Sequence, residues 1–151
     1  MNNDSIREMR KLTQQYAYTS LQMHEAVGRK AGLSGTDHKY LGFLLVRGQM
    51  TAGELSTLTG LTTGAVTGLI DRFEKKKLVR RQFGKDDRRK IFIVPNTDKI
   101  MAIFEPLYKE FRKESEKLSA SFSNGEIKII QTYFTRAIEI MNDVTNKLNH
   151  K

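Results

Sequence analysis

The stretch TAGELSTLTGLTTGAVTGLIDRFEKKKLVRR, from Thr51 to Arg81, contains two helical patterns separated by a single glycine. Thr51 and Glu54 have the spacing of a capping box, which predicts that a short helix begins there. Gly60 ends that helix, because glycine readily adopts the left-handed conformation in which helices terminate. Thr62 is the expected N-cap of the next helix. Two short helices joined by a tight turn indicate a helix-turn-helix motif.

The second of these helices is expected to have an apolar face and a small, polar face. At about 100° per residue, one side of the helix is expected to pack inward and carries Val66, Leu69, Ile70 and Phe73. The opposite side carries Gly64, Thr67, Gly68, Asp71 and Lys75, with Thr63 and Arg72 at its borders. A helix without bulky side chains can lie deep in the DNA major groove, where threonines meet base edges. The alternative is that the two glycines permit close packing of a neighbouring helix.

The segment RRQFGKDDRRKIFIV, residues 80–94, is predicted to form two strands joined by a charged loop. From Asp71 to Lys90 there are ten basic and four acidic residues, so a net +6 of the chain's +9 lies in this region. A charge run alone is usually a solvated face. Beside a helix-turn-helix, however, a basic hairpin is typical of a wing that binds DNA. The residues expected to bind DNA are Thr62, Thr63, Gly64, Thr67, Gly68, Arg72, Arg81, Lys85, Arg88 and Arg89.

Carboxylates close to this surface require an explanation, because DNA phosphates repel them. We predict that one of two aspartates, Asp71 on the second helix or Asp87 in the hairpin, pairs with Arg89. This pair would brace the hairpin against the helix. The alternative is that Arg89 enters the minor groove while Asp87 orients it.

Regular apolar spacing continues on both sides of this region. The last helix is expected to begin at a capping box of Ser123 and Glu126 and to continue with a heptad pattern. Residues 1–32 and 97–151 are therefore predicted to form a helical dimerisation region around a winged helix-turn-helix at 33–96. The first and last helices have apolar faces too long for one small domain to cover, which predicts a homodimer. The expected interface residues are Met9, Leu12, Tyr16, Ile127, Ile130, Phe134, Met141, Val144 and Leu148.

With these features the sequence resembles the MarR family of transcriptional regulators over nearly its whole length. The resemblance lies in Thr51–Arg81 and in KDDRRKIFIV, residues 85–94, where Asp87 and Arg89 match the Asp-x-Arg signature of the family's wing. It implies a mainly α fold with a small β-hairpin wing, and a homodimer in which the first, fifth and sixth helices intertwine. It also implies a palindromic DNA target, most often repression, and often a small-molecule pocket between the dimer and winged domains.

Two positions depart from the family pattern. Lys77 stands where a glycine usually precedes the wing, at a cost of about 1–2 kcal/mol if the left-handed conformation is kept. Pro95 and Asn96 replace the Leu-Thr that usually follows the wing. Because proline cannot donate a ladder hydrogen bond, the last strand of the wing is expected to be short.

A small aromatic or lipophilic effector is a further expected partner. Apolar side chains with a few polar tips suit a ligand pocket. Those that could line one are Tyr16, Met23, His38, Tyr40, Phe43, Tyr108 and Phe111. The same aromatic spacing also fits an ordinary core.

Composition argues against several other functions. The 151 residues include no cysteine, which excludes disulfides and thiolate zinc sites. His24, His38 and His150 lie far apart without metal-site spacing, so no catalytic residue, metal or cofactor is expected. Neither a membrane span nor a signal peptide is recognisable, and we expect a cytoplasmic protein. The alternative function is a winged-helix module that binds RNA or a protein partner through its basic hairpin.

Overall fold

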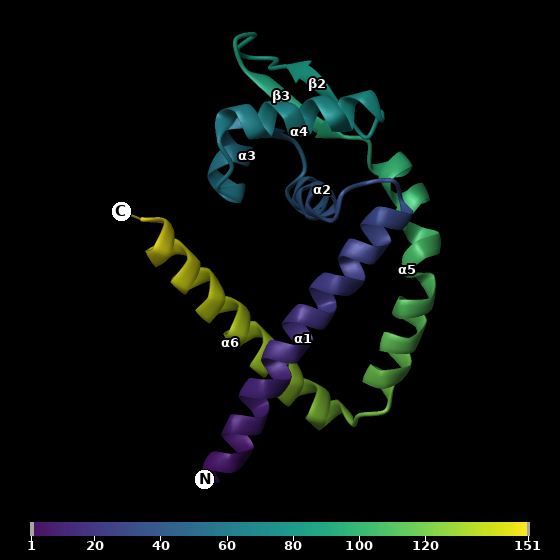
Figure 1. The fold of residues 1–151 in the computed structure, drawn as a ribbon, viewed down its shortest axis with the longest axis vertical. Helices are drawn as coiled ribbons and strands as arrows, with labels where there is room; N and C mark the ends of the chain where they lie inside the picture. Colours follow the sequence, from purple (N-terminus) through teal and green to yellow (C-terminus); the bar gives the residue numbers. More distant parts are fainter. Residues whose placement is uncertain (1, 151) are drawn as a thin grey trace. The chain divides into compact units, whose positions relative to one another are not determined.

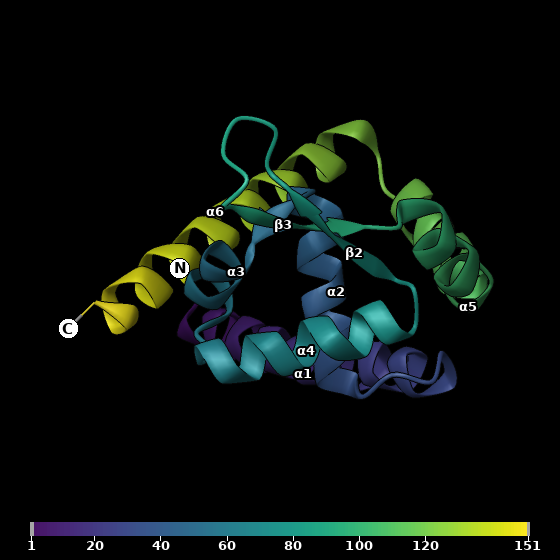
Figure 2. The same ribbon diagram turned by 90° about the horizontal axis from the view of Figure 1, so that it is seen from above.

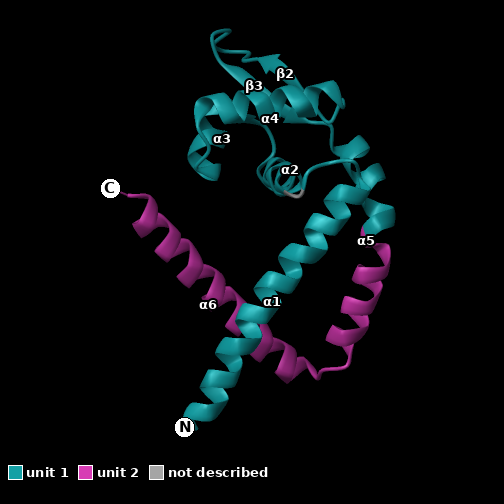
Figure 3. Cartoon of the chain, in the orientation of Figure 1, with its two compact units in different colours: residues 1–107 teal, residues 108–151 magenta. Residues whose placement is uncertain are grey.

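The computed structural model describes residues 2–150 and is mainly helical with a small antiparallel sheet (Figure 1). The elements in chain order are α1 (Asn3–Lys30), α2 (Gly35–Arg47), β1 (Met50–Thr51), α3 (Ala52–Thr59), α4 (Thr63–Lys75), β2 (Val79–Phe83), β3 (Ile91–Pro95), α5 (Thr97–Ala120) and α6 (Asn124–Asn149). The chain divides into two compact units, residues 1–107 and 108–151 (Figure 3). No helix in the described part of the chain is long and apolar enough to cross a membrane.

The predicted helix starts are confirmed by their capping hydrogen bonds. At α3, the Thr51 hydroxyl accepts from the Glu54 N–H at 3.1 Å, and the Glu54 carboxylate accepts from the Thr51 N–H at 3.4 Å. Ser123 and Glu126 form the same reciprocal pair at α6. Gly60 ends α3 with a φ of 73°, a left-handed conformation that favours glycine. These local signals set the short turn that separates α3 from α4.

The core of the first unit contains the inward face of α4. Val66, Leu69, Ile70 and Phe73 are all buried, as their spacing predicts. They are joined by buried leucines of α2 and α3, including Leu41, Leu44 and Leu55. Figure 2 shows α2, α3 and α4 close to the sheet, and α4 borders β2 while α2 and α3 border β3. The other face of α4 is consequently left at the surface of this unit.

The sheet has the order β1-β3-β2. The two long strands pair antiparallel, from Val79 with Pro95 to Phe83 with Ile91. Pro95 is the last residue of β3, where its missing N–H interrupts no further pairing. The edge strand β1, whose Met50 pairs with Ile93, was not predicted. Two residues are too few to produce a recognisable alternating pattern.

Lys77 keeps the left-handed conformation despite its side chain, with a φ of 60°. The Lys77 N–H donates to the Glu74 carbonyl and the Leu78 N–H donates to the Phe73 carbonyl, both at 2.9 Å. This is the hydrogen-bond pattern of a Schellman motif, which satisfies the last carbonyls of a helix. The Asn96 N–H then donates to the Leu78 carbonyl at 2.8 Å. The turn therefore leads directly into the wing.

The second unit contains the end of α5 and all of α6. Just before this unit begins, Pro106 lies inside α5, and its missing N–H cannot donate to the carbonyl of Ala102. No described residue of α6 is buried. Among the described residues, the buried apolar core lies entirely within residues 33–104. The predicted interface side chains are accordingly uncovered in one chain: Phe134 is 45% exposed and Met141 60% exposed.

Candidate nucleic-acid interface

The outward face of α4 is small, polar and open. Thr63, Gly64 and Thr67 are exposed, and Gly68 is half-exposed. A Cβ atom added at Gly64 would have no neighbour within 4 Å, and one at Gly68 would meet only the Arg72 guanidinium, at 3.5 Å. Among the described residues, no other helix packs against these glycines. Close packing within the chain therefore does not explain them.

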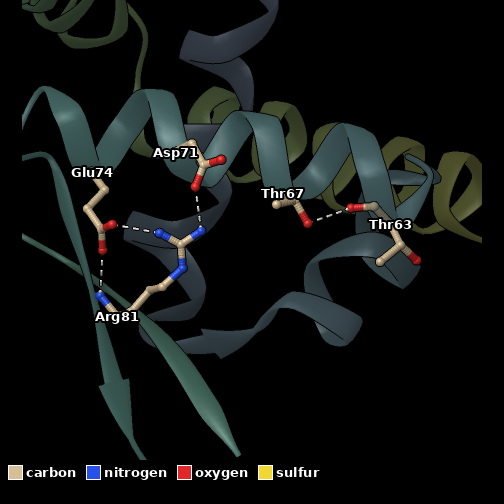
Figure 4. A network of polar contacts seen from close by, with 5 residues as sticks. All are labelled: Thr63, Thr67, Asp71, Glu74 and Arg81. Carbon is tan, nitrogen blue, oxygen red and sulfur yellow. Dashed lines mark hydrogen bonds and ion pairs between the residues drawn. The ribbon is translucent and has the colours of Figure 1, made fainter.

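The threonines on this face are ordered by the helix itself. The Thr67 hydroxyl donates to the Thr63 carbonyl at 3.0 Å (Figure 4). This back-bond uses the hydroxyl hydrogen, while the oxygen lone pairs and the methyl group remain available to a partner. At the start of the helix, the Thr62 hydroxyl accepts from the Ala65 N–H at 3.2 Å. Thr62 is thus engaged as the N-cap.

Arg72, which the sequence assigned to DNA, is held by a buried aspartate of α2. Its Nε and Nη2 donate to the two carboxylate oxygens of Asp37, each at 2.9 Å. The Asp37 side chain is only 10% exposed, and its backbone N–H donates to the Ser34 hydroxyl. The hydrogen bond to Asp37 raises the pKa of Arg72. This bidentate pair ties α4 to the first turn of α2, and sequence reasoning missed it.

Arg81 joins the wing to α4. Its guanidinium donates to Asp71 Oδ1 and to Glu74 Oε1, both at 2.6 Å, and its N–H donates to Glu74 Oε2 at 3.3 Å (Figure 4). The hydrogen bond to Asp71 is the main cause of the raised pKa of Arg81. Asp71 and Glu74 are one turn apart on α4, so both reach the same strand residue. The Asp71 carboxylate on the outward face of α4 is therefore paired with a cation of β2.

Arg89 pairs with Asp87 rather than with Asp71. Its Nε lies 3.1 Å from Asp87 Oδ1, and its N–H donates to the same oxygen at 3.0 Å. The guanidinium and then the N–H of Arg89 lower the pKa of the Asp87 carboxyl. Both residues belong to the loop between β2 and β3, so this pair orders the wing tip and does not reach α4. The link between wing and helix is made instead by Arg81.

The wing loop is closed by its backbone. The Gly84 N–H donates to the Lys90 carbonyl at 2.9 Å, and the Lys90 N–H donates to the Asp87 carbonyl at 3.1 Å. A Cβ atom at Gly84 would lie 2.6 Å from the Asp87 carbonyl oxygen, a separation that real side chains do not show. Glycine is therefore required for this close approach. Lys85 and Arg88 are exposed on the loop.

The residues proposed for an effector pocket have mixed environments. The His38 ring lies 4.7 Å from the Phe104 ring and 6.0 Å from that of His24. Burial, and then the charge of His38, lower the pKa of His24. Tyr40 is buried, while Phe43 and Met23 are half-buried and Tyr16 is exposed. Tyr108 and Phe111 belong to the second unit, and burial raises the pKa of Tyr108. Within residues 2–150, no group of three potential metal ligands is found.

Comparisons with known proteins agree with this arrangement. Residues 31–90 match the model of the MarR family. The chain is 36% identical over 125 residues to YcgE of Bacillus subtilis (strain 168), an uncharacterized HTH-type transcriptional regulator, covering 83% of this chain and 80% of that one. A MarR family protein from Bacillus stearothermophilus has a similar structure, with a TM-score of 0.73 and 23% identity over 94% of this chain and 99% of its own.

A second solved structure is a mutant of MepR from S. aureus, bound to an oligodeoxyribonucleotide. It matches with a TM-score of 0.59 and 19% identity, over 88% of this chain and 97% of that one. At these identities, both structures show the fold alone. They confirm the predicted winged-helix fold, while the family match and the identity to YcgE indicate a transcriptional regulator and not an enzyme. The chain belongs to the MarR family of DNA-binding transcriptional regulators.

Proposed function

We propose that this protein is a homodimeric repressor that binds a palindromic operator through α4 and the wing. The observation that carries the proposal is the open face of α4, where a Cβ atom at Gly64 would touch nothing. Two ion-pair groups hold this helix to two other elements: Asp37 of α2 binds Arg72, and Arg81 of β2 binds Asp71 and Glu74. A helix that is fixed in orientation and free of bulk is suited to the major groove.

The dimer is supported by the apolar side chains that one chain leaves uncovered. On α6 they include Phe134, Met141, Val144 and Leu148, and on α1 they include Met9, Leu12 and Tyr16. Ile127 and Ile130, at the start of the α6 pattern, are half-buried. A twofold partner would remove these faces from water. Two-fold symmetry in the protein then selects a palindrome in DNA.

Individual roles follow from the contacts. We assign Thr63, Gly64, Thr67 and Gly68 to the approach to base edges, and Thr62 to the N-cap that positions them. Lys85 and Arg88 are assigned to phosphates or the minor groove, and Arg89 to the same surface while Asp87 orients it. Arg72 and Arg81 are positioning residues in this proposal, because carboxylates already occupy their guanidinium groups.

A small aromatic or lipophilic effector that releases the operator completes the proposal. The support is the cluster of His24, His38 and Phe104 in the first unit, which combines ring surfaces with titratable groups. Such a combination suits recognition of a small molecule. Thermal-shift screening with phenolic and lipophilic compounds, followed by an assay of DNA release, tests this part independently.

The main test is a competition between oligonucleotides. An operator selected from random duplexes should be palindromic, and should bind at least about a thousandfold more tightly than bulk duplex or structured RNA. Equal binding of structured RNA would instead favour the alternative of an RNA-binding module. If the chain binds neither duplex DNA nor RNA but does bind a protein, the alternative of a protein-binding module would be favoured.

Replacing Arg88 or Arg81 by alanine should weaken operator binding in different ways. The slope of log K against log salt is negative, and its magnitude should fall by about 0.9 for each phosphate contact that Arg88→Ala removes. Arg81→Ala should leave that slope nearly unchanged and cost about 1 kcal/mol of binding, because it loosens a partly exposed brace. Fluorescence anisotropy over a salt series measures both. Lys117→Ala, on α5, is the control for a simple loss of charge. An equal fall in slope for Arg81→Ala would place Arg81 on the phosphates.

A further inference from the structure

Two large apolar side chains, Phe83 and Ile91, are exposed at the outer end of the wing strands. Phe83 is 67% exposed and Ile91 42% exposed. They lie directly opposite each other in the register of β2 and β3, so both point to the same face of the sheet. A phenylalanine left in water forgoes the free energy that its burial would release. This apolar pair is therefore a candidate contact surface.

The apolar pair belongs to the face of the sheet that is directed towards α4. Side chains alternate along a strand, so Phe83 shares its face with Val79 and Arg81. Val79 is buried, and the Arg81 guanidinium reaches Asp71 on the outward face of α4 (Figure 4). The apolar pair follows Arg81 on this same face of the hairpin. It therefore lies between the helix that the wing is linked to and the loop at the wing tip.

The loop beyond the apolar pair carries a net positive charge. The Gly84 N–H donates to the Lys90 carbonyl and closes the loop immediately after the pair. Residues 84–90 contain four basic and two acidic residues, which gives a net charge of +2. Lys85 and Arg88 are exposed in this loop. The surface therefore combines exposed apolar side chains with neighbouring cations.

The backbone of duplex DNA presents the complementary combination. Each phosphate group is followed by a deoxyribose ring, whose carbon–hydrogen edges are apolar. A sugar–phosphate strand also separates the two grooves of a duplex. A surface between a helix in the major groove and a loop at phosphates or the minor groove must face that strand. A second copy of the wing is a poorer occupant, because it would place two positively charged loops together.

We propose that Phe83 and Ile91 pack against deoxyribose rings of the DNA strand that passes between α4 and the wing loop. The cations of the loop bind the phosphates of that strand, and the apolar pair binds the sugars between them. The contact distinguishes no base, and its apolar part is not weakened by salt. The inference rests on the proposed function, because it requires duplex DNA to lie against both α4 and the wing.

A purely structural role for the apolar pair would have a different signature. Aromatic and β-branched side chains that face each other across two strands stabilise a hairpin. If their loss deformed the hairpin, Lys85 and Arg88 would also lose their phosphate contacts. The salt dependence of binding would then become weaker. Loss of a sugar contact alone lowers the affinity at every salt concentration and leaves the salt dependence unchanged.

The test uses Phe83→Thr and Ile91→Thr, because threonine suits a strand and removes most of the apolar surface. Fluorescence anisotropy over a salt series should show binding about tenfold weaker for Phe83→Thr and about threefold weaker for Ile91→Thr, with unchanged slopes. The loss should be equal on the operator and on random duplex, because both have the same sugars. Val46→Thr is the matched control, since Val46 is an exposed apolar residue of α2 outside this surface, and it should change nothing.

Two further measurements identify what the apolar pair touches. Calorimetry at several temperatures should give a less negative heat-capacity change of binding for Phe83→Thr, because less apolar surface is buried. Isotope-filtered NMR of the complex should show contacts from the Ile91 methyl groups to deoxyribose protons. Contacts to base protons would instead indicate insertion between base pairs, and contacts to a second protein chain would indicate a subunit interface. Either result would overturn the inference.

The affinities separate this inference from the proposed function. Unchanged DNA binding by Phe83→Thr would leave the apolar pair without a role in the complex. A weaker salt dependence in that variant would assign the pair to the structure of the hairpin, which also contradicts the inference. If the chain prefers no palindromic operator but its binding to random duplex still depends on Phe83, the proposed function fails and the sugar contact stands.

Discussion

A chain with lysine in place of both Phe134 and Met141 should lose its dimer and at least about a hundredfold of its operator affinity. The two side chains are 45% and 60% exposed on a helix that has no buried residue, and the proposed twofold partner would cover them. In a twofold dimer the double substitution buries four unpaired ammonium groups, which costs several kcal/mol for each ion. A monomer also binds a single half-site and loses the effective concentration that links the two, a factor of about 10² to 10⁴.

Sedimentation velocity measures the oligomeric state of the variant, and fluorescence anisotropy measures its operator affinity. Thr132→Lys/Thr135→Lys is the matched control, because it adds the same charge to exposed positions of α6 that lie off the heptad pattern. The control should remain dimeric and should bind the operator normally. A stable monomer of the Phe134/Met141 variant that retains full operator affinity would show that α6 is not the interface.

A second large loss of operator affinity is expected from a substitution at the centre of the open face of α4. Thr67→Ala should cost about 1–3 kcal/mol on the true operator and almost nothing on random duplex. The hydroxyl hydrogen is already used within the helix, so the loss concerns the lone pairs and the methyl group that face outward. Alanine has the higher helix propensity, and the free energy of unfolding should therefore not fall.

The measurement is a pair of titrations, one on the selected operator and one on random duplex. Thr132→Ala is a close control, because the Thr132 hydroxyl makes the same back-bond, to the Lys128 carbonyl at 2.9 Å, on the exposed surface of α6. It should leave both titrations unchanged. If Thr67→Ala weakens both duplexes equally, α4 does not read bases.

Sequence reasoning succeeded where a signal is local. The capping boxes at Thr51 and Ser123 depend on residues three positions apart, and the buried face of α4 depends on a repeat within one helix. In each case the interacting groups are close along the chain, so spacing alone defines the geometry.

The roles of the basic residues were harder to assign, because charge does not specify a partner. Asp37 and Arg72 are 35 residues apart, and nothing in the spacing of either residue indicates that they meet. Arg81 reaches Asp71 and Glu74 only because β2 turns back along α4. Arg72 was assigned to DNA from its place beside the outward face of its helix and Arg81 from the basic hairpin, whereas the fold supplies carboxylates for each.

Pro106 divides the hydrogen-bond ladder of α5 close to the boundary between the two compact units. The amide protons of α4 belong to a helix with four buried side chains, whereas no residue of α6 is buried. The two sets should therefore exchange with solvent deuterium through different opening events. If association of two chains supplies the missing protection, exchange in α6 becomes slower as protein concentration rises, while exchange in α4 does not change. Exchange in α4 would then serve as an internal reference, and exchange in α6 would report on the association of two chains.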